Sequence, residues 1–129
     1  MRKNFWSLLR FLRLAGILQL SYRGILDEYG WYKSFYAKKS IDKKGAPIPW
    51  YSYSAIDFLS GRLNNQMKIF EFGSGNSTIW FATRTKNVVA VEHDLNWFKA
   101  IKSSMSSNVD IRYKSLIYNG EYCRTAAET

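Results

Sequence analysis

Apolar residues in the second half of the chain occur in short runs, separated by stretches with helical periodicity. The short runs predict buried strands at Lys68–Phe72, Asn87–Val91 and Val109–Tyr113. The stretches between them predict helices at Ser77–Thr85 and Leu95–Met105. This order is that of one half of a doubly wound fold, so we expect an α/β domain with a partial Rossmann-like parallel sheet of about three strands and crossover helices.

The residues before this alternation predict N-terminal helices followed by a loop. Residues 1–29 form a basic, apolar segment in which a helix is expected over Phe5–Leu20. Residues 30–50 are basic and aromatic, lack clear periodicity and end in Pro-Ile-Pro-Trp, which is typical of a loop. A helix is expected next at Ser52–Leu63, and residues 51–129 are expected to form the domain that holds the sheet.

The composition is that of a single globular domain. Hydrophobic residues make up 47% of the 129 residues and charged residues 22%, which excludes a disordered tail and supplies enough apolar material for a core. Cys123 is the one cysteine, so a disulfide framework and a cysteine-based zinc site are excluded within the chain. A reducing compartment, and so the cytoplasm, is the expected location.

The net charge of +9 favours anionic partners such as nucleic acid, acidic lipid headgroups or phosphorylated substrates. Five basic residues precede the first acid, Asp27, and a second group of lysines lies in the expected loop. That loop group is typical of a solvated surface, although a polyanion-binding role stays open. Nucleic acid is not the expected partner, because the chain carries no recognised nucleic-acid motif and no platform for stacking bases.

The apolar opening of the chain leaves two interpretations. Arg10 and Arg13 interrupt it, so its longest uncharged piece is far shorter than the ~20 residues that span a bilayer. As one helix its amphipathic pattern is imperfect, because Trp6, Leu14 and Ile17 share the arc of the arginines. The helix either packs on the domain or a partner chain, or lies peripherally on the inner face of a membrane with apolar side chains such as Phe5 inserted.

Candidate chemistry gathers where the first two strands end. The candidate ligand-binding residues are Glu71, Gly73, Ser74, Gly75, Asn76, Ser77, Thr78, Glu92 and His93. Both groups belong to the carboxyl ends of neighbouring parallel strands, the edge at which open α/β sheets bind ligands. Gly73 and Gly75 permit a tight turn and a close approach to a ligand. Glu92 is spaced to accept hydrogen bonds from two ribose hydroxyls, which indicates a nucleoside ligand.

The residues around the glycines discriminate between nucleoside ligands. Thr78 stands where a dinucleotide fingerprint has its third glycine, and no lysine follows to complete a phosphate-binding loop. A carboxylate at Glu71 would repel a pyrophosphate but can hold the ammonium group of an amino acid. A nucleoside with an amino-acid tail and no phosphate is S-adenosylmethionine, which is the expected cofactor.

At this point the sequence resembles the class I S-adenosylmethionine-dependent methyltransferases. Residues 71–75 resemble their motif I, residues 91–94 resemble the acidic motif after strand two, and residues 48–51 resemble the segment before motif I in small bacterial, FkbM-like members. The resemblance implies that Glu71 and the backbone of residues 73–75 hold the methionine part. It also implies that Glu92 holds the ribose and that His93 lies near the adenine.

The resemblance also implies a substrate class, and it implies that strands of the family fold are missing from this chain. Some FkbM-like members act in surface polysaccharide or glycolipid synthesis, so a small-molecule, glycan or glycolipid acceptor is expected. The family fold has seven strands, whereas this chain is expected to supply about three and no evident catalytic base, so it reads as a truncated, N-terminal portion. An oligomeric partner or another chain would then complete the sheet. The alternative is a non-catalytic remnant, or a basic module associated with membranes or nucleic acid.

Overall fold

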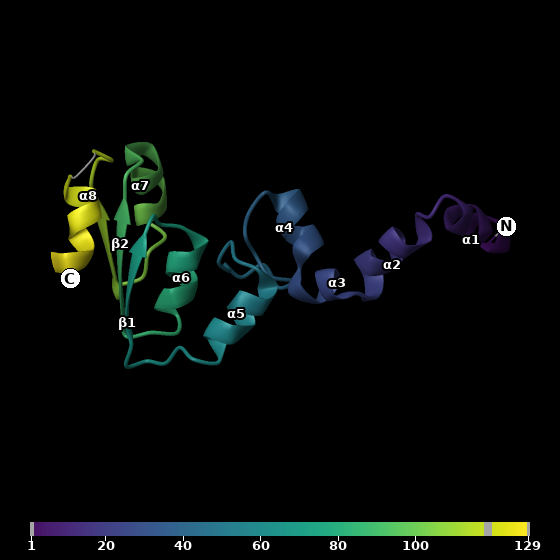
Figure 1. Cartoon of the computed structure of the whole chain (residues 1–129), viewed down its shortest axis with the longest axis horizontal. Coiled ribbons are helices and arrows are strands. Elements are labelled where there is room, and N and C mark those ends of the chain that lie inside the picture. The colour runs from purple at the N-terminus through teal and green to yellow at the C-terminus, as the bar shows by residue number, and fades with distance from the viewer. Residues whose placement is uncertain (1, 118–119, 129) are drawn as a thin grey trace. The chain divides into compact units, whose positions relative to one another are not determined.

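The computed structural model describes residues 2–117 and 120–128 and divides into two compact units, Met1–Ala46 and Pro47–Thr129 (Figure 1). The division falls inside a Gly-Ala-Pro-Ile-Pro sequence, whose prolines favour extended backbone. No helix in the described part of the chain is both long enough and apolar enough to cross a membrane.

The second unit is built on a three-stranded parallel sheet. Its strands are β1 (Lys68–Phe72), β2 (Asn87–Glu92) and β3 (Val109–Tyr113), paired in the order β1-β2-β3. The register places Ile69 opposite Val88 and Val88 opposite Val109. The expected three-stranded parallel sheet of an α/β fold is therefore confirmed, with β1 and β3 as its two edges.

One helix precedes the first strand and two connect the strands, at the expected places but shorter than expected. They are α5 (Tyr53–Ser60), α6 (Asn76–Ala82) and α7 (Leu95–Lys102). The first ends before Gly61, whose flexibility disfavours helix, and the last ends before two serines, which compete for backbone hydrogen bonds. The Asp94 side chain caps α7 as expected, because it accepts hydrogen bonds from the N–H groups of Asn96 and Trp97.

One face of the sheet carries the hydrophobic core. The core residues are Ile48, Ile56, Trp80, Phe81, Ala82 and Val88, with Ile69 and Val109 packed against them. Since side chains alternate along a strand, residues 69, 88 and 109 point to the same side, toward α5 and α6. Helix α7 covers the same side, where Phe98 lies 6.0 Å from Tyr113 between ring centroids.

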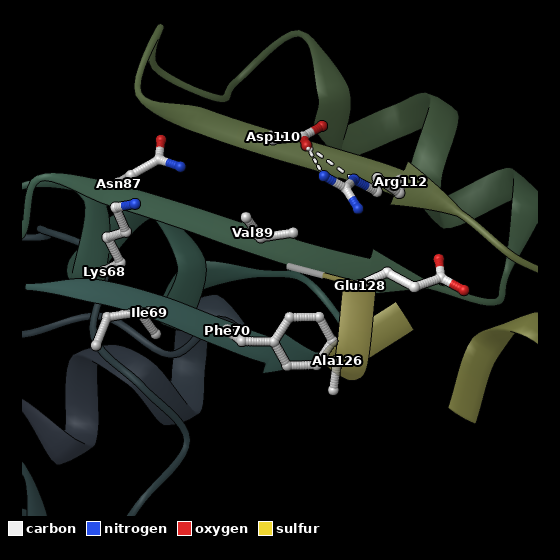
Figure 2. Close-up of a pocket in the computed structure, with 9 residues that line it drawn as sticks. All are labelled: Lys68, Ile69, Phe70, Asn87, Val89, Asp110, Arg112, Ala126 and Glu128. Carbon is white, nitrogen blue, oxygen red and sulfur yellow. Dashed lines mark hydrogen bonds and ion pairs between the residues drawn. The ribbon is translucent and has the colours of Figure 1, made fainter. Parts of the chain in front are cut away.

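The opposite face of the sheet is covered only in part within the described residues. A short helix α8 (Glu121–Arg124) and a 3₁₀ helix (Thr125–Glu128) lie on this side (Figure 1). Between the 3₁₀ helix and the strands is a cavity of about 430 Å³ with Phe70 and Val89 in its wall. Figure 2 shows the ion pair of Arg112 with Asp110 across this cavity wall, at 2.6 Å.

The first unit contains helices α1 (Arg2–Phe11), α2 (Ala15–Arg23), α3 (Ile25–Tyr29) and α4 (Trp31–Ala37). The prediction of one continuous helix over Phe5–Leu20 is wrong, because the helix is interrupted between α1 and α2. Arg13 has a positive φ of 57°, which ends α1 without a glycine or proline to mark the end in the sequence.

The expectation that residues 30–50 form a loop is wrong for their first third, which is helix α4. Gly30 adopts a φ of 83° and separates α3 from α4. The Ser34 hydroxyl donates to the carbonyl oxygen of Ile41 at 2.6 Å and accepts from the Ile41 N–H at 2.9 Å. These bonds hold residues 39–46 against α4. The helix is therefore stabilised by contacts with residues that follow it, which the irregular sequence pattern did not indicate.

Candidate functional site

The glycine turn after β1 leaves open space at the carboxyl edge of the sheet. The Gly73 N–H donates to the carbonyl oxygen of Val91 at 2.8 Å, which holds the turn against β2. Gly73 has a φ of 84°, a conformation that favours glycine. A Cβ built at Gly73 or Gly75 would meet no atom within 4 Å. A side of the turn is therefore open at both glycines.

Glu92, at the end of β2, is buried and accepts four hydrogen bonds. Its Oε2 accepts from the backbone N–H of Ser74 at 3.0 Å and from the Ser74 hydroxyl at 2.8 Å. Its Oε1 accepts from the N–H groups of His93 at 2.8 Å and Asp94 at 3.0 Å. Glu92 is 4% exposed, so the chain itself occupies the acceptor positions of this carboxylate.

These bonds decide the charge of Glu92. Burial raises the pKa of the carboxyl group, but the hydrogen bonds from Asp94, Ser74 and His93 outweigh burial and leave the pKa below its ordinary value. Glu92 therefore lies at the expected edge as a carboxylate, yet its Oε2 faces Ser74 rather than open space. A ligand hydroxyl could bond to this carboxylate only by replacing one of these four hydrogen bonds.

Glu71, at the end of β1, lies in a second hydrogen-bonded group beside the same turn. The Thr78 hydroxyl donates to Glu71 Oε2 at 2.6 Å and accepts from the Gly75 N–H at 3.0 Å. Thr78 is fully buried. Thr78 thus links the turn to Glu71. Thr78 therefore has a structural role at the position where a dinucleotide fingerprint has glycine.

The surroundings of Glu71 shift its pKa in the opposite direction from that of Glu92. Burial raises the pKa of Glu71, and the charge of Glu92 adds to the rise, while hydrogen bonds from Ser77 and Thr78 oppose it. Burial raises the pKa of the Tyr51 phenol, and the negative charge of the nearby Glu71 raises it further. The two carboxyl groups flank one turn and differ in how readily they hold a proton.

Two aromatic residues that the sequence did not indicate as site residues also lie here. The Trp97 Nε1–H donates to the carbonyl oxygen of Ser74 at 2.8 Å. The Tyr122 ring lies 5.7 Å from the His93 ring in a T-shaped arrangement and 5.4 Å from Phe72, between centroids. Trp97 fits the apolar face of its helix and Tyr122 follows no periodic pattern, so no sequence signal was available for Tyr122.

Tyr122 lies against the backbone of the glycine turn. It forms a hydrogen bond with the Gly73 backbone, and burial together with the charge of Glu92 raises the pKa of its phenol. His93 is half exposed, and its Nδ1 lies 3.4 Å from Glu92 Oε1. The edge therefore combines two carboxyl groups, one histidine and one tyrosine around accessible glycines.

The structure brings together every residue expected at the site. Asn76, Ser77 and Thr78 form the first turn of α6, directly after the glycines. None of the expected site residues lines the cavity on the other face of the sheet. Among the residues described, no three His, Cys, Asp or Glu side chains form a group that could hold a metal ion.

Comparison with known proteins adds no family to this geometry. No protein-family model matches the chain, and no curated protein matches it. The assignment of a function therefore rests on the residues at the carboxyl edge of the sheet.

Proposed function

We propose that the carboxyl edge of the sheet binds S-adenosylmethionine, and that this unit is the cofactor-binding part of a Rossmann-like methyltransferase domain. The observation that carries the proposal is the placement of Glu71 and Glu92 on either side of a glycine turn with open space at Gly73 and Gly75. A dinucleotide is disfavoured because a carboxyl group beside the turn would repel its pyrophosphate.

The proposal gives each side chain a task. Glu71 would hold the ammonium group of the methionine part, and a bound cation would favour the charged form that burial disfavours. Gly73 and Gly75 would let the ligand lie against the backbone. Glu92 would exchange its two bonds from Ser74 for the two ribose hydroxyls, so the number of hydrogen bonds at Oε2 need not fall.

The acceptor in this proposal is a small molecule, a glycan or a glycolipid. The cofactor supplies an activated methyl group, so the chain's own residues mainly bind and orient it. The edge of β1 that pairs with no described strand is where further strands would extend the sheet, from an oligomeric partner or a completing chain.

Calorimetric titration of the whole chain with S-adenosylmethionine and with S-adenosylhomocysteine tests the proposal. We expect micromolar binding of both ligands, because they share the nucleoside and the amino-acid tail. Glu92→Gln should abolish it, since an amide presents one oxygen where the ribose needs a carboxylate. Glu128→Gln, an exposed glutamate on the other side of the sheet, is the matched control and should bind as the unsubstituted chain does.

A second variant tests the exchange itself. Ser74→Ala removes the hydroxyl that bonds to Glu92 Oε2, so the proposal predicts equal or tighter binding of the cofactor. If Ser74 were instead needed to hold the carboxylate in place for the ligand, binding would weaken. A folded chain that binds neither ligand would favour the alternative of a non-catalytic module.

A further inference from the structure

The first two helices expose nearly all of their apolar side chains. Phe5, Leu8, Phe11, Ile17 and Leu20 are all exposed, with Phe11 at 83%. Among the residues of Met1–Ala46 whose side chains are described, Leu9 is the one buried apolar side chain. An apolar surface of this kind marks an interaction site in a soluble chain.

The break after α1 gives each short helix its own apolar face. At 100° per residue, Ser7 and Arg10 lie on the side of α1 opposite Phe5 and Leu8. Ile17, which shares the arc of the arginines in one continuous helix, belongs to α2. Trp6 and Phe11 lie on either side of Ser7 and Arg10, so exposed aromatic rings flank the cation of α1.

Helix α4 presents a second exposed face, made of aromatic rings. Trp31 and Phe35 stack with their centroids 5.2 Å apart and their planes 14° apart. Both rings are exposed, as is Tyr36 at 79%. Ser34 of the same helix bonds to the backbone of Ile41, which holds residues 39–46 to α4. The rings of Phe35 and Tyr36 stay exposed beside these bonds.

Cations accompany both faces. Residues 1–46 contain ten Lys and Arg against three Asp and Glu, a net charge of +7, whereas residues 47–129 carry +2. Arg10, Lys38 and Lys39 are exposed. The cations are thus concentrated in the unit that exposes its apolar side chains.

We infer that the unit Met1–Ala46 binds the surface of an anionic lipid bilayer. Aromatic rings and short amphipathic helices insert at the boundary between headgroups and acyl chains, while neighbouring cations bind acidic headgroups. Nucleic acid explains the cations but offers no apolar phase for Phe11 and its neighbours. A second copy of the unit explains the apolar faces but would bring two charges of +7 together.

Flotation of the whole chain with vesicles tests the inference without reference to the cofactor. We expect the chain to float with vesicles of phosphatidylcholine and phosphatidylglycerol, and to float weakly with phosphatidylcholine alone. The double variant Phe11→Ser/Phe35→Ser should lose most of the binding while keeping its fold, since both side chains are exposed. Leu116→Ser/Ile117→Ser removes two exposed apolar side chains from the other unit and should leave binding unchanged.

Charge variants separate the lipid surface from other partners. Lys38→Gln/Lys39→Gln should weaken the partition onto anionic vesicles roughly tenfold, and Lys86→Gln/Lys99→Gln, in the other unit, should have little effect. Equal losses from both pairs would mean that only the net charge matters, and would overturn the inference. So would binding to a random DNA duplex, or concentration-dependent dimers, in a chain that does not float with anionic vesicles.

Discussion

The two units use their apolar residues in opposite ways. In Pro47–Thr129, Val88 and Val91 are fully buried, and Trp80 and Phe81 fill the space between helix and sheet. In Met1–Ala46, Leu9 is the one apolar side chain buried among those described. One unit therefore follows the usual rule that burial of apolar surface drives folding, and the other leaves most of that surface exposed.

What holds the first unit together instead is a set of backbone contacts. Gly30 is buried, and a Cβ there would clash with the backbone of Asp42 and Lys43. Asp42 Oδ1 accepts hydrogen bonds from the N–H groups of Lys44 and Ala46, both at 2.8 Å. Each hydrogen bond contributes only about 0.5–1.5 kcal/mol net to stability. Because this unit buries little apolar surface besides, we expect it to be the less stable one.

Truncation of one phenylalanine in each unit gives the largest expected effect. Phe81→Ala opens a cavity in the core and should lower the free energy of unfolding by about 3–5 kcal/mol. Phe11→Ala, at an 83% exposed position, should change it by less than about 0.5 kcal/mol. Urea unfolding followed by circular dichroism measures both. A large loss with Phe11→Ala would show that the first unit has a core after all.

Substitution at Gly30 tests the backbone contacts of the first unit. Gly30→Ala forces a Cβ into the backbone of the 42–43 turn at a position with a positive φ, so it should destabilise residues 25–46 by about 2 kcal/mol. Hydrogen exchange should then become faster at the amides of Ile41 and Ala46, and its rate should not change at the β2 amides. Gly16→Ala, where a Cβ meets nothing within 4 Å, is the control.

The sequence predicted the sheet unit better than the first unit, and the reason is physical. The run Asn87–Glu92 is short and rich in β-branched valine, and most of its residues are buried, so its length and composition indicate a strand. Helix α4 presents its aromatic face to solvent, so the contrast between a buried and an exposed side is missing from its sequence. The break at Arg13 carries no glycine or proline and depends on local contacts.

At the candidate site, the sequence predicted which residues meet but not how they bond. The glycine turn and Glu92 follow from the ends of two strands, which the sequence places at one edge. The bonds from Ser74 to Glu92 join residues 18 apart, and the bond from Trp97 to Ser74 joins residues 23 apart. Side-chain bonds over such separations depend on tertiary packing, and no local pattern encodes them.

Two carboxylates that bind backbone N–H groups, one in each unit, provide the finest test of the comparison. Glu92 uses both oxygens as acceptors, so the amide group of Glu92→Gln would turn an N–H toward a donor and should cost about 1–3 kcal/mol at neutral pH. Asp42 uses Oδ1 alone for its two bonds, so Asp42→Asn can keep both through its amide oxygen and should cost less.

The pH dependence separates charge from shape at Glu92. Because the folded-state pKa of Glu92 lies below its ordinary value of 4.5, its contribution is fully present above that value and is lost as the pH falls through the folded-state pKa. The cost of Glu92→Gln should therefore shrink below about pH 4.5. Glu71 works in the opposite sense, because its raised pKa favours the folded state most at low pH. If the cost of Glu92→Gln stayed constant from pH 3 to 7 in urea unfolding, the shape of the amide rather than the loss of charge would be its cause.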